Sequence, residues 1–333
     1  MKIGVSLLNF RPGLIGGAET YVRQLAAHMP DVAAGHELVL IANRDNAESI
    51  VSPGWKRFVV DSSTLQITCM RLAEAFTLWR ARGIERDIES LGLDAILFPQ
   101  QSIFPKATAV PSVMTVVDVQ HLFFPQYFSL AERAFRAAAY PAGLRRAGHV
   151  IAISEYTRQT LIGRCGVNPA KVTAVPFGAE TVDISHVEPT TNITGPYLYY
   201  PAATFSHKKH ETLLRTFAAL KNRGDFPYKL VLTGMRTKRW PALCAEAREL
   251  GIADDVIHPG FVPFAEVQRI YRGAAAIVFP SEFEGFGLPV VEAVEFGKKV
   301  ITSRLAVFDE IGVPKEFQID FANPDELAAA LAS

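Results

Sequence analysis

Short apolar runs rich in β-branched residues recur along the whole chain, with stretches of helical periodicity between them. Continuous apolar strands that alternate with helices are typical of parallel sheets covered on both faces. The expected strands form two series, 3–8, 37–41, 95–98, 112–117, 149–153 and 172–175, then 197–200, 229–233, 256–258, 276–279 and 299–302. Two such series predict an α/β protein with two Rossmann-like, doubly wound parallel-sheet domains.

The stretch between the two series lacks helical or strand periodicity and carries Pro189, Gly195 and Pro196. We therefore expect an N-terminal domain over 1–180, a linker over 181–196 and a C-terminal domain over 197–333. A length of 333 residues suits two domains of ordinary size. Ligands bind at the carboxyl ends of the strands in such domains, so the sequence predicts two domains facing across a ligand-binding cleft.

The charge balance argues against a general polyanion binder, because 34 Lys and Arg residues match 34 Asp and Glu residues. Nucleic acid is therefore excluded as a partner, and a bound anion needs a local site. The three cysteines show no metal-ligand spacing. The N-terminus lacks a signal-peptide pattern, and the apolar runs are shorter than the roughly 18 residues that span a membrane. These features predict a cytoplasmic protein.

The segment 279–293 carries the strongest functional pattern. A buried strand ends there, a loop with two glycines follows, and a helix is expected to begin near Leu288. A glycine loop that opens a helix offers free backbone N–H groups to a phosphate or sugar oxygen. Glu284 in the loop and Glu292 in the helix would both reach a ligand that carries hydroxyl groups. The alternative is a plain strand–turn–helix connection with a capping glutamate.

The basic turn 207–210 follows the strand expected at 197–200 and precedes a helix. A lysine that points into a cleft from the end of a strand can neutralise a diphosphate leaving group. Lys208 is the favoured residue and Lys209 the second choice. A solvated basic turn is the alternative.

Two further segments follow strands of the first series. Gly16 and Gly17 precede a helix and permit a backbone to approach a ligand closely, although a plain tight turn has the same pattern. Asp118 and His121 follow the strand at 112–117, where an active site is expected. His121 lies beside Leu122 in the sequence and could instead be a core residue.

The segment 68–86 mixes apolar side chains with Arg71, Arg80, Arg82 and Arg86. It could form a helix on a membrane surface or contact a lipid-linked acceptor. An ordinary helix with a solvated basic face is the alternative. Peripheral membrane contact, at the inner face of the membrane, therefore stays open.

The chain resembles the retaining glycosyltransferases of family 4, which have the GT-B fold. The Glu-x7-Glu element from Glu284 to Glu292 resembles their donor-binding signature. Weaker resemblances cover most of the remaining chain, at 16–25, 151–158, 172–178, 260–262 and 271–274.

This resemblance implies a role for each site residue. The backbone of Gly285, Phe286, Gly287 and Leu288 would bind the sugar and phosphate region. Glu284 would hold sugar hydroxyls and Glu292 the ribose, while Phe261 and Val262 would border the base. Lys208, with Lys209 beside it, would stabilise the departing diphosphate, and the Gly16-Gly17 loop would approach the donor phosphates and the acceptor.

Two departures from the family pattern concern the chemistry. The family usually has an arginine where this chain has Ala203, and Arg236, Lys238 or Arg239 would have to replace it. Many members have adjacent His-Asp where this chain has Asp118 and, three residues later, His121. The resemblance assigns the histidine role to His121.

The resemblance implies a nucleotide diphosphate sugar as co-substrate, with GDP-mannose preferred, and no catalytic metal or other cofactor. A hydroxyl of a glycan or a lipid-linked acceptor would receive the sugar, in surface-polysaccharide synthesis. Two other functions stay open: a non-catalytic nucleotide-sugar-binding or scaffold subunit, and a GT-B nucleotide-sugar epimerase.

Overall fold

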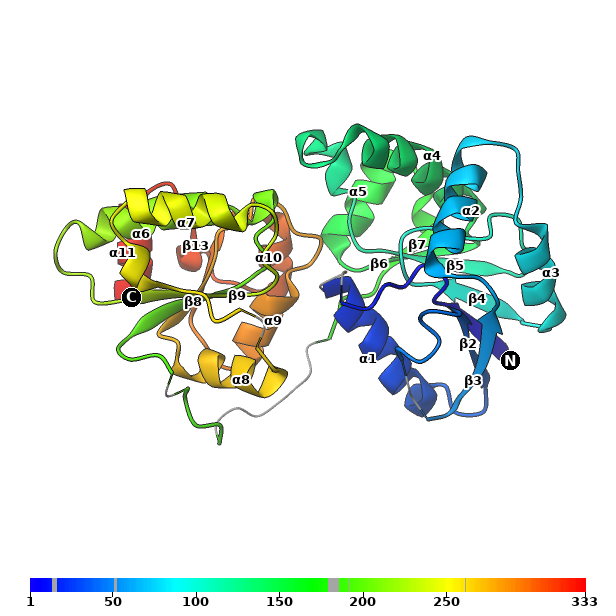
Figure 1. Cartoon of the computed structure of the whole chain (residues 1–333), viewed down its shortest axis with the longest axis horizontal. Coiled ribbons are helices and arrows are strands. Elements are labelled where there is room, and N and C mark those ends of the chain that lie inside the picture. The colour runs from blue at the N-terminus through cyan, green and yellow to red at the C-terminus, as the bar shows by residue number, and fades with distance from the viewer. Residues whose placement is uncertain (14–16, 51–52, 179–185, 191, 261) are drawn as a thin grey trace. The chain divides into compact units, whose positions relative to one another are not determined.

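The computed structural model describes residues 1–13, 17–50, 53–178, 186–190, 192–260 and 262–333. The chain divides into two compact units, Met1–Phe177 and Gly178–Ser333, and each has its own sheet (Figure 1). Residues 181–185 and 191 of the expected linker lie outside the described residues.

Within its described residues, the first unit holds a seven-stranded parallel sheet in the order β3-β2-β1-β4-β5-β6-β7. Its strands are β1 (Lys2–Ser6), β2 (Glu37–Asn43), β3 (Trp55–Val60), β4 (Ala95–Phe98), β5 (Ser112–Val116), β6 (His149–Ala152) and β7 (Val172–Ala174). Its helices are α1 (Gly17–Val32), α2 (Thr64–Phe76), α3 (Arg82–Ser90), α4 (Leu130–Arg146) and α5 (Glu155–Cys165), with 3-10 turns η1 (Gln120–Leu122), η2 (Pro125–Tyr127) and η3 (Pro169–Lys171).

Two apolar layers cover this sheet, one on each face. The larger core packs Val39 and Ile41 of β2 with residues of α2, α3, α4 and α5. The smaller one packs Leu40 of the same strand against Val22 and Ala26 of α1. Successive side chains of a strand point to opposite faces, so the continuous apolar run of β2 serves both layers.

The second unit holds, among its described residues, a six-stranded parallel sheet in the order β10-β9-β8-β11-β12-β13. Its strands are β8 (Tyr197–Pro201), β9 (Lys229–Thr233), β10 (Val256–Ile257), β11 (Ala276–Phe279), β12 (Val300–Ser303) and β13 (Gln318–Ile319). Its helices are α6 (His210–Lys221), α7 (Trp240–Glu249), α8 (Phe264–Gly273), α9 (Leu288–Glu295), α10 (Ala306–Ile311) and α11 (Pro324–Ala332), with η4 (Ser206–Lys208), η5 (Ala253–Asp255) and η6 (Lys315–Phe317).

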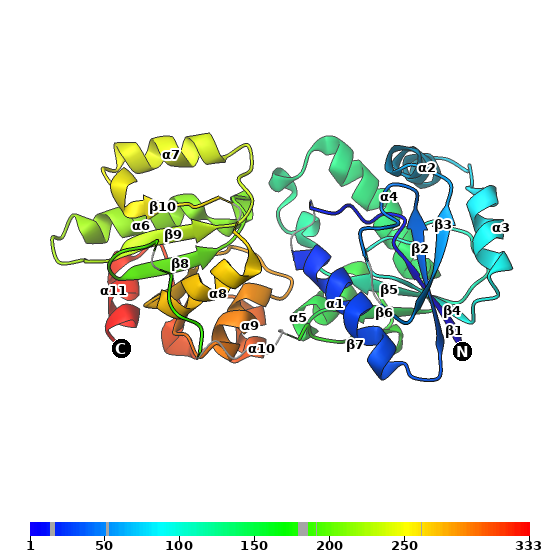
Figure 2. The same cartoon turned by 60° about the horizontal axis from the view of Figure 1, so that its bottom comes forward.

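Figures 1 and 2 show α6 and α7 on one face of this second sheet and α8 and α9 on the other. The prediction of two doubly wound parallel sheets is confirmed, and every expected strand has a counterpart within about two residues. Strands β3 and β13 have no counterpart among the strands expected from the sequence. Strand β3 is a mostly exposed edge strand that contains Lys56 and Arg57, so it has no apolar run. Strand β13 has only 2 residues.

Candidate functional site

Strand β8 lies between β9 and β11, so the loops that follow these strands leave the same edge of the sheet. We call them the β8–α6 loop (202–209), the β9–α7 loop (234–239) and the β11–α9 loop (280–287). Two of the residues selected from the sequence, Lys208 and Glu284, lie on the first and third loops. Parallel topology therefore brings together segments that are 76 residues apart.

Lys208 and Glu284 form an ion pair, with 2.5 Å between Nζ and Oε1. Their side chains are only 16% and 11% exposed. The ammonium group also lies 5.1 Å from the ring centre of Phe279, the last residue of β11. The hydroxyl of the fully buried Tyr200 donates to the Lys208 carbonyl at 2.7 Å, which fixes the backbone at this point. The structure thus places a partly buried cation and carboxylate together at the edge of the sheet.

A second pair links the same two loops. Lys209 Nζ lies 3.0 Å from Glu282 Oε2, and the Glu282 N–H donates to the His207 carbonyl at 2.8 Å. Lys209 also adopts a left-handed backbone, with φ of 51°, immediately before α6. Since a residue other than glycine rarely adopts this conformation, surrounding contacts must hold it there.

Helices α6 and α9 both begin at this edge, and within the described ranges neither has a side-chain hydrogen bond at its N-cap. Gly287, at the N-cap of α9, has φ of +102°, and a Cβ on it would lie 2.9 Å from the Phe308 ring. Glycine is therefore required for this helix start. Uncapped first-turn N–H groups carry partial positive charge and suit a phosphate or sugar oxygen. Of the neighbouring loop residues, Phe286 is buried, whereas Gly285 and Leu288 are half-buried.

Glu292 lies on α9, where the hydroxyl of Tyr271 donates to its Oε2 at 3.1 Å. Tyr271 comes from α8, is fully buried, and also donates to the Pro289 carbonyl at 3.2 Å. Glu292 itself is half-buried, so a fixed carboxylate remains accessible. Tyr271 is not among the site residues expected from the sequence, although it begins one of the segments that resemble the family.

The β9–α7 loop supplies one arginine close to Lys208. Arg239 donates to Ser206 Oγ at 2.9 Å and pairs with Glu211 of α6. Arg236 instead donates to the His258 carbonyl at 2.6 Å and lies 5.0 Å from the Trp240 ring. The contacts of Arg239, rather than those of Arg236, thus reach the turn that contains Lys208.

The remaining sequence candidates of this unit are less informative. Val262 is half-buried and lies just before α8, and Lys238 is exposed. Phe261 lies outside the described residues.

Two histidines beside Lys208 are neutral at physiological pH. Burial and the Lys208 charge lower the pKa of His207 to about 4 and that of His210 to about 3. His210 is only 2% exposed, and its ring lies 4.7 Å from that of Tyr200. These imidazoles therefore add no positive charge near Lys208.

The first unit has its own polar edge, where β4 and β5 end. Asp118 Oδ1 accepts from the Gln120 N–H at 2.9 Å and so shapes η1, which contains His121. The His121 ring lies edge-on to Tyr140, with 5.2 Å between ring centres. Burial and the charge of Arg136 lower the pKa of His121 to about 4. The two sequence candidates of this edge therefore lie in one turn, with a neutral imidazole.

Several buried polar side-chain atoms at this edge have no hydrogen-bond partner among the described residues. They are Asn9 Oδ1 after β1, Gln100 Oε1 after β4, and Gln120 Nε2 and His121 Nδ1 after β5. Strands β1, β4 and β5 are adjacent in the sheet, so these residues follow neighbouring strand ends. Buried polar groups without partners are costly, and a polar ligand would satisfy them.

Of the two expected loop glycines, Gly17 is the first residue of α1 and Gly16 lies outside the described residues. Glu19 of the same helix accepts from the Gly13 N–H at 2.7 Å. The structure thus confirms that a helix follows the glycine pair.

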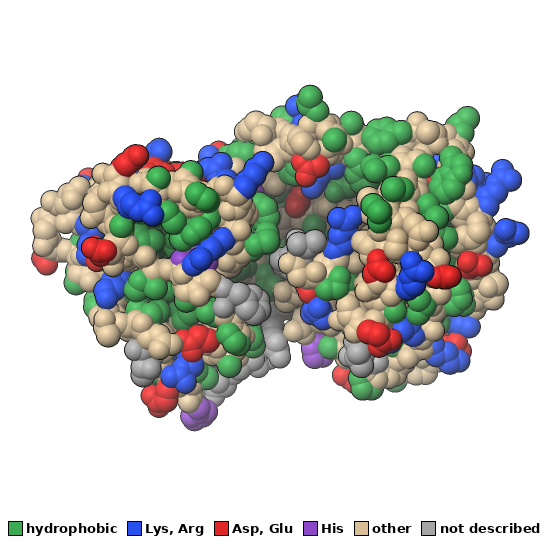
Figure 3. Space-filling model, in the orientation of Figure 1, with side chains coloured by type: hydrophobic (Ala, Val, Ile, Leu, Met, Phe, Trp, Pro, Cys, Tyr) green, Lys and Arg blue, Asp and Glu red, His purple; other side chains and the backbone are tan. Residues whose placement is uncertain are grey.

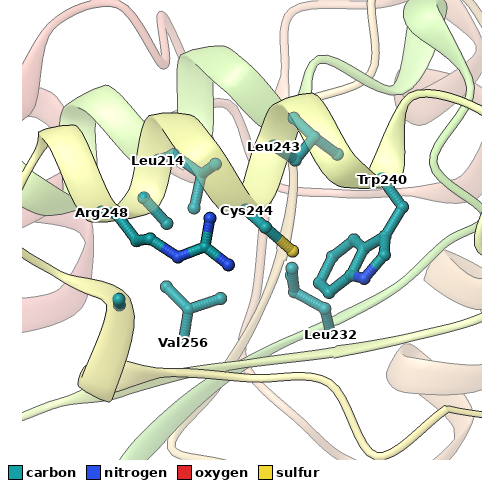
Figure 4. Close-up of a pocket in the computed structure, with 9 residues that line it drawn as sticks. Leu214, Leu232, Trp240, Leu243, Cys244, Arg248 and Val256 are labelled. Atoms are coloured by element: carbon teal, nitrogen blue, oxygen red, sulfur yellow. The ribbon is translucent and has the colours of Figure 1, made fainter.

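The second unit also contains a cavity of about 150 Å³ under α7 (Figure 4). Its lining is mostly apolar and includes Trp240, Leu243 and Cys244, but none of the residues selected from the sequence. Within the described ranges, no group of three or more His, Cys, Asp or Glu side chains could hold a metal ion. In the same part of the chain, no helix is both long and apolar enough to cross a membrane.

The curated relatives with assigned activities match this chain at low identity and over only part of their length. The chain is 24% identical over 213 residues to the O-antigen chain mannosyltransferase RfbU of Salmonella typhimurium, a match that covers 64% of this chain and 57% of the relative. It is 29% identical to O-antigen chain mannosyltransferase B of Escherichia coli, over 34% of this chain and 30% of the relative. It is 27% identical to the MMP alpha-(1->4)-mannosyltransferase of Mycolicibacterium hassiacum, over 56% and 45%. The matches thus span less than two thirds of these relatives.

Solved structures match almost the whole chain. Sucrose-phosphate synthase from Thermosynechococcus elongatus has a TM-score of 0.71 at 18% identity, covering 100% of this chain and 89% of that one. Anabaena HepE, in complex with UDP and glucose, has a TM-score of 0.70 at 18% identity, with the same coverage. At this identity the likeness establishes the fold alone, and it agrees with the predicted GT-B fold.

Two family models together cover the chain from residue 15 to its end. Residues 15–182 match the model described as Glycosyltransferase Family 4, which is more than half of the chain. Residues 183–333 match the model described as Glycosyl transferases group 1. The family predicted from the Glu-x7-Glu element is confirmed: the chain belongs to the group 1 glycosyltransferases of family 4.

Proposed function

We propose that the protein is a retaining glycosyltransferase that moves a sugar, preferably mannose from GDP-mannose, to a hydroxyl of a glycan or lipid-linked acceptor in surface-polysaccharide synthesis. The ion pair between Lys208 and Glu284 supports this proposal most directly. Lys208 is a cation suited to a diphosphate, Glu284 is a carboxylate suited to sugar hydroxyls, and the two are in direct contact. The preference for mannose rests on the distant mannosyltransferase relatives.

In this proposal the second unit binds the donor. Lys208 and the first-turn N–H groups of α6 and α9 stabilise the negative charge that develops on the diphosphate as its bond to the sugar breaks. Glu284 moves from Lys208 to the sugar hydroxyls. Glu292, oriented by Tyr271, accepts hydrogen bonds from the ribose.

We assign the position of the missing family arginine to Arg239. Its bond to Ser206 Oγ holds it against the β8–α6 loop, which contains Ala203 and Lys208. Arg236 already binds the His258 carbonyl and the Trp240 face. Lys209, which is paired with Glu282, would add a second positive charge near the diphosphate.

The first unit would bind the acceptor. His121 and Asp118 lie in the turn after β5, beside buried polar atoms that lack partners in the part of the chain that the structure describes. A glycan hydroxyl at this edge would supply the missing hydrogen bonds. Because its pKa is lowered, His121 would be a neutral hydrogen-bonding group rather than a cation.

The deciding experiment incubates the purified protein with GDP-mannose, UDP-sugars and ADP-sugars, with and without glycan and lipid-linked acceptors. Transfer of sugar that depends on an acceptor, with retained anomeric configuration, supports the proposal. Conversion of the donor alone would indicate an epimerase. Family members typically work without a metal ion, so EDTA should leave the rate unchanged.

Ala203, where the family usually has arginine, favours a second candidate. If Arg239 does not replace the family arginine, the protein would be a nucleotide-sugar-binding subunit without turnover. Nucleotide binding without transfer to any acceptor would support this candidate.

A further inference from the structure

The first unit contains a cavity of about 920 Å³ that the proposed donor chemistry does not use. Residues of α2, of the segment after α2, of the stretch 102–107 and of α4 line it. Its volume is near the upper end of the roughly 300–1,000 Å³ typical of ligand pockets. The apolar part of the lining includes Phe76, Leu78, Phe104 and Phe135, together with several alanines.

Four cations line this cavity, namely Arg71, Lys106, Arg145 and Arg146, against the single carboxylate of Glu74. Glu74 is buried, and its two oxygens accept from the N–H groups of Ala81 and Lys106, each at 2.8 Å. In the described part of the chain, none of the four cations forms an ion pair with a carboxylate. The cavity thus combines an apolar part with an excess of positive charge.

Arg71 connects the cavity to the polar edge of the unit. Its guanidinium donates to Ser102 Oγ at 2.9 Å and lies 5.3 Å from the Phe135 ring centre. Asn9 Nδ2, after β1, lies 3.3 Å from the same hydroxyl. Burial lowers the pKa of Arg71 to about 10, as expected for a desolvated cation without a counter-anion. A bound anion would remove this cost.

The rim of the cavity is unusually apolar for an exposed surface. Among the lining residues, Leu78 is 98% exposed and Phe76 is 54% exposed. Figure 3 shows hydrophobic side chains at the surface over α2 and α4. Exposed apolar groups beside a pocket mark a surface that is covered when its ligand or a membrane is present.

We propose that this cavity binds a phosphate group carried on a hydrocarbon chain, the lipid part of a lipid-linked acceptor, with the phosphate at Arg71 and the chain along the apolar lining. This inference deepens the proposed function, on which its biological role rests. The cations match the phosphate, and the apolar lining and rim match the chain. A purely soluble glycan would leave both features unexplained.

The test measures binding of farnesyl phosphate to the whole chain by calorimetry, below its micellar concentration and without donor. Farnesol and inorganic phosphate serve as probes of chain and phosphate alone. We expect both to bind at least tenfold more weakly than farnesyl phosphate. Equal binding of farnesol would overturn the assignment of the phosphate site. Binding to vesicles of phosphatidylcholine and phosphatidylglycerol, without binding of farnesyl phosphate, would overturn the proposal in favour of membrane docking.

Two variants test the two halves of the site separately. Arg71→Met removes the charge, and Ala138→Trp fills the cavity without changing charge. Each should weaken farnesyl phosphate binding at least tenfold, whereas Arg86→Gln, on an exposed part of α3, should not. Unchanged nucleotide binding and Tm confirm that the variants fold. Wild-type affinity in both folded variants would refute the site.

The two proposals fail differently. Binding of farnesyl phosphate without sugar transfer would overturn the proposed function and support the lipid site. Transfer to soluble glycans, without binding of farnesyl phosphate, would overturn the lipid site alone.

Discussion

Because Lys208 and Glu284 form an ion pair, we expect substitutions of the two residues to have opposite effects on nucleotide affinity. In the free protein the Glu284 carboxylate is paired with the Lys208 ammonium group, with 2.5 Å between Oε1 and Nζ. In the proposed donor site, a diphosphate would therefore compete with Glu284 for Lys208. Lys208→Met removes the cation, whereas Glu284→Gln removes the competing charge and keeps the shape. We expect the first variant to lose nucleotide affinity and the second to keep or gain it.

The magnitudes follow from the contact and its burial. A hydrogen bond to a charged group contributes about 1.5–3 kcal/mol, so Lys208→Met should raise the Kd for the nucleoside diphosphate roughly 10- to 150-fold. The two side chains are 16% and 11% exposed, so the pair is still reached by solvent. Releasing Lys208 from such a pair is worth about 1 kcal/mol, or roughly fivefold tighter binding in Glu284→Gln. Sugar transfer should nevertheless fall at least about tenfold in both variants.

Calorimetric titration with GDP and UDP measures the Kd, and product formation with the active donor measures transfer. Lys315→Met is the matched control, because Lys315 forms an exposed ion pair with Asp309 on the same unit. Unchanged nucleotide affinity in Lys208→Met would refute the assignment of Lys208. An equal loss of affinity in both variants would show that Glu284 binds the nucleotide instead of competing with it.

Three further predictions concern the frame of the site. Gly234→Ala should lower the free energy of unfolding by about 2 kcal/mol, because Gly234 has φ of +114° and a Cβ would lie 2.7 Å from the Ala202 carbonyl carbon; a wild-type Tm in calorimetry would contradict this. Tyr271→Phe removes the hydrogen bond to Glu292, which is worth about 1 kcal/mol, so the same titration should show nucleotide binding about fivefold weaker. Wild-type affinity would show that Glu292, as oriented by Tyr271, does not bind the ribose. The pKa of His210 is about 3 in the folded protein, against roughly 6.5 when unfolded, so the unfolded chain binds the proton first. The contribution of His210 to the free energy of unfolding should therefore be complete above about pH 6.5 and fall by about 1.4 kcal/mol per pH unit below it. Denaturant titrations from pH 8 to 5 should show a shallower slope for His210→Gln, and identical slopes would show that this imidazole does not titrate differently on folding.

Sequence patterns predicted the edge of the sheet on which the candidate residues lie. Lys208 and Glu284 each follow a strand by a few residues, and strand ends of a parallel sheet share one edge. The pairing of these two side chains was not predictable, because it depends on β8 and β11 being neighbours in the sheet. Strand order is a property of the tertiary fold, and periodicity does not contain it.

Helix orientation limited the prediction in a similar way. Tyr271 reaches Glu292 because α8 packs its buried face against α9, a contact that spans 21 residues. Arg236 and Arg239 could not be distinguished from their spacing, since only the path of the β9–α7 loop decides which one faces Ser206.

The segment 68–86 also differs from the single helix considered from the sequence. Thr77 ends α2, and its Oγ1 accepts from the Trp79 N–H at 3.0 Å. The chain then turns before α3 begins at Arg82. A side chain that competes for backbone hydrogen bonds ends a helix without any glycine or proline, so periodicity alone does not reveal it.

The bonds between Thr204 and Thr237 affect how the protein meets its donor. The Thr237 N–H donates to Thr204 Oγ1, and the Thr237 hydroxyl donates to the Thr204 carbonyl, both at 2.8 Å. The β8–α6 and β9–α7 loops are thus joined before any ligand arrives. Ordering a side chain on binding costs about 0.5–1.5 kcal/mol, and a preorganised loop avoids much of this entropic cost. Donor affinity in this protein should therefore depend on fit to an already rigid surface, and the heat capacity change on binding should be small.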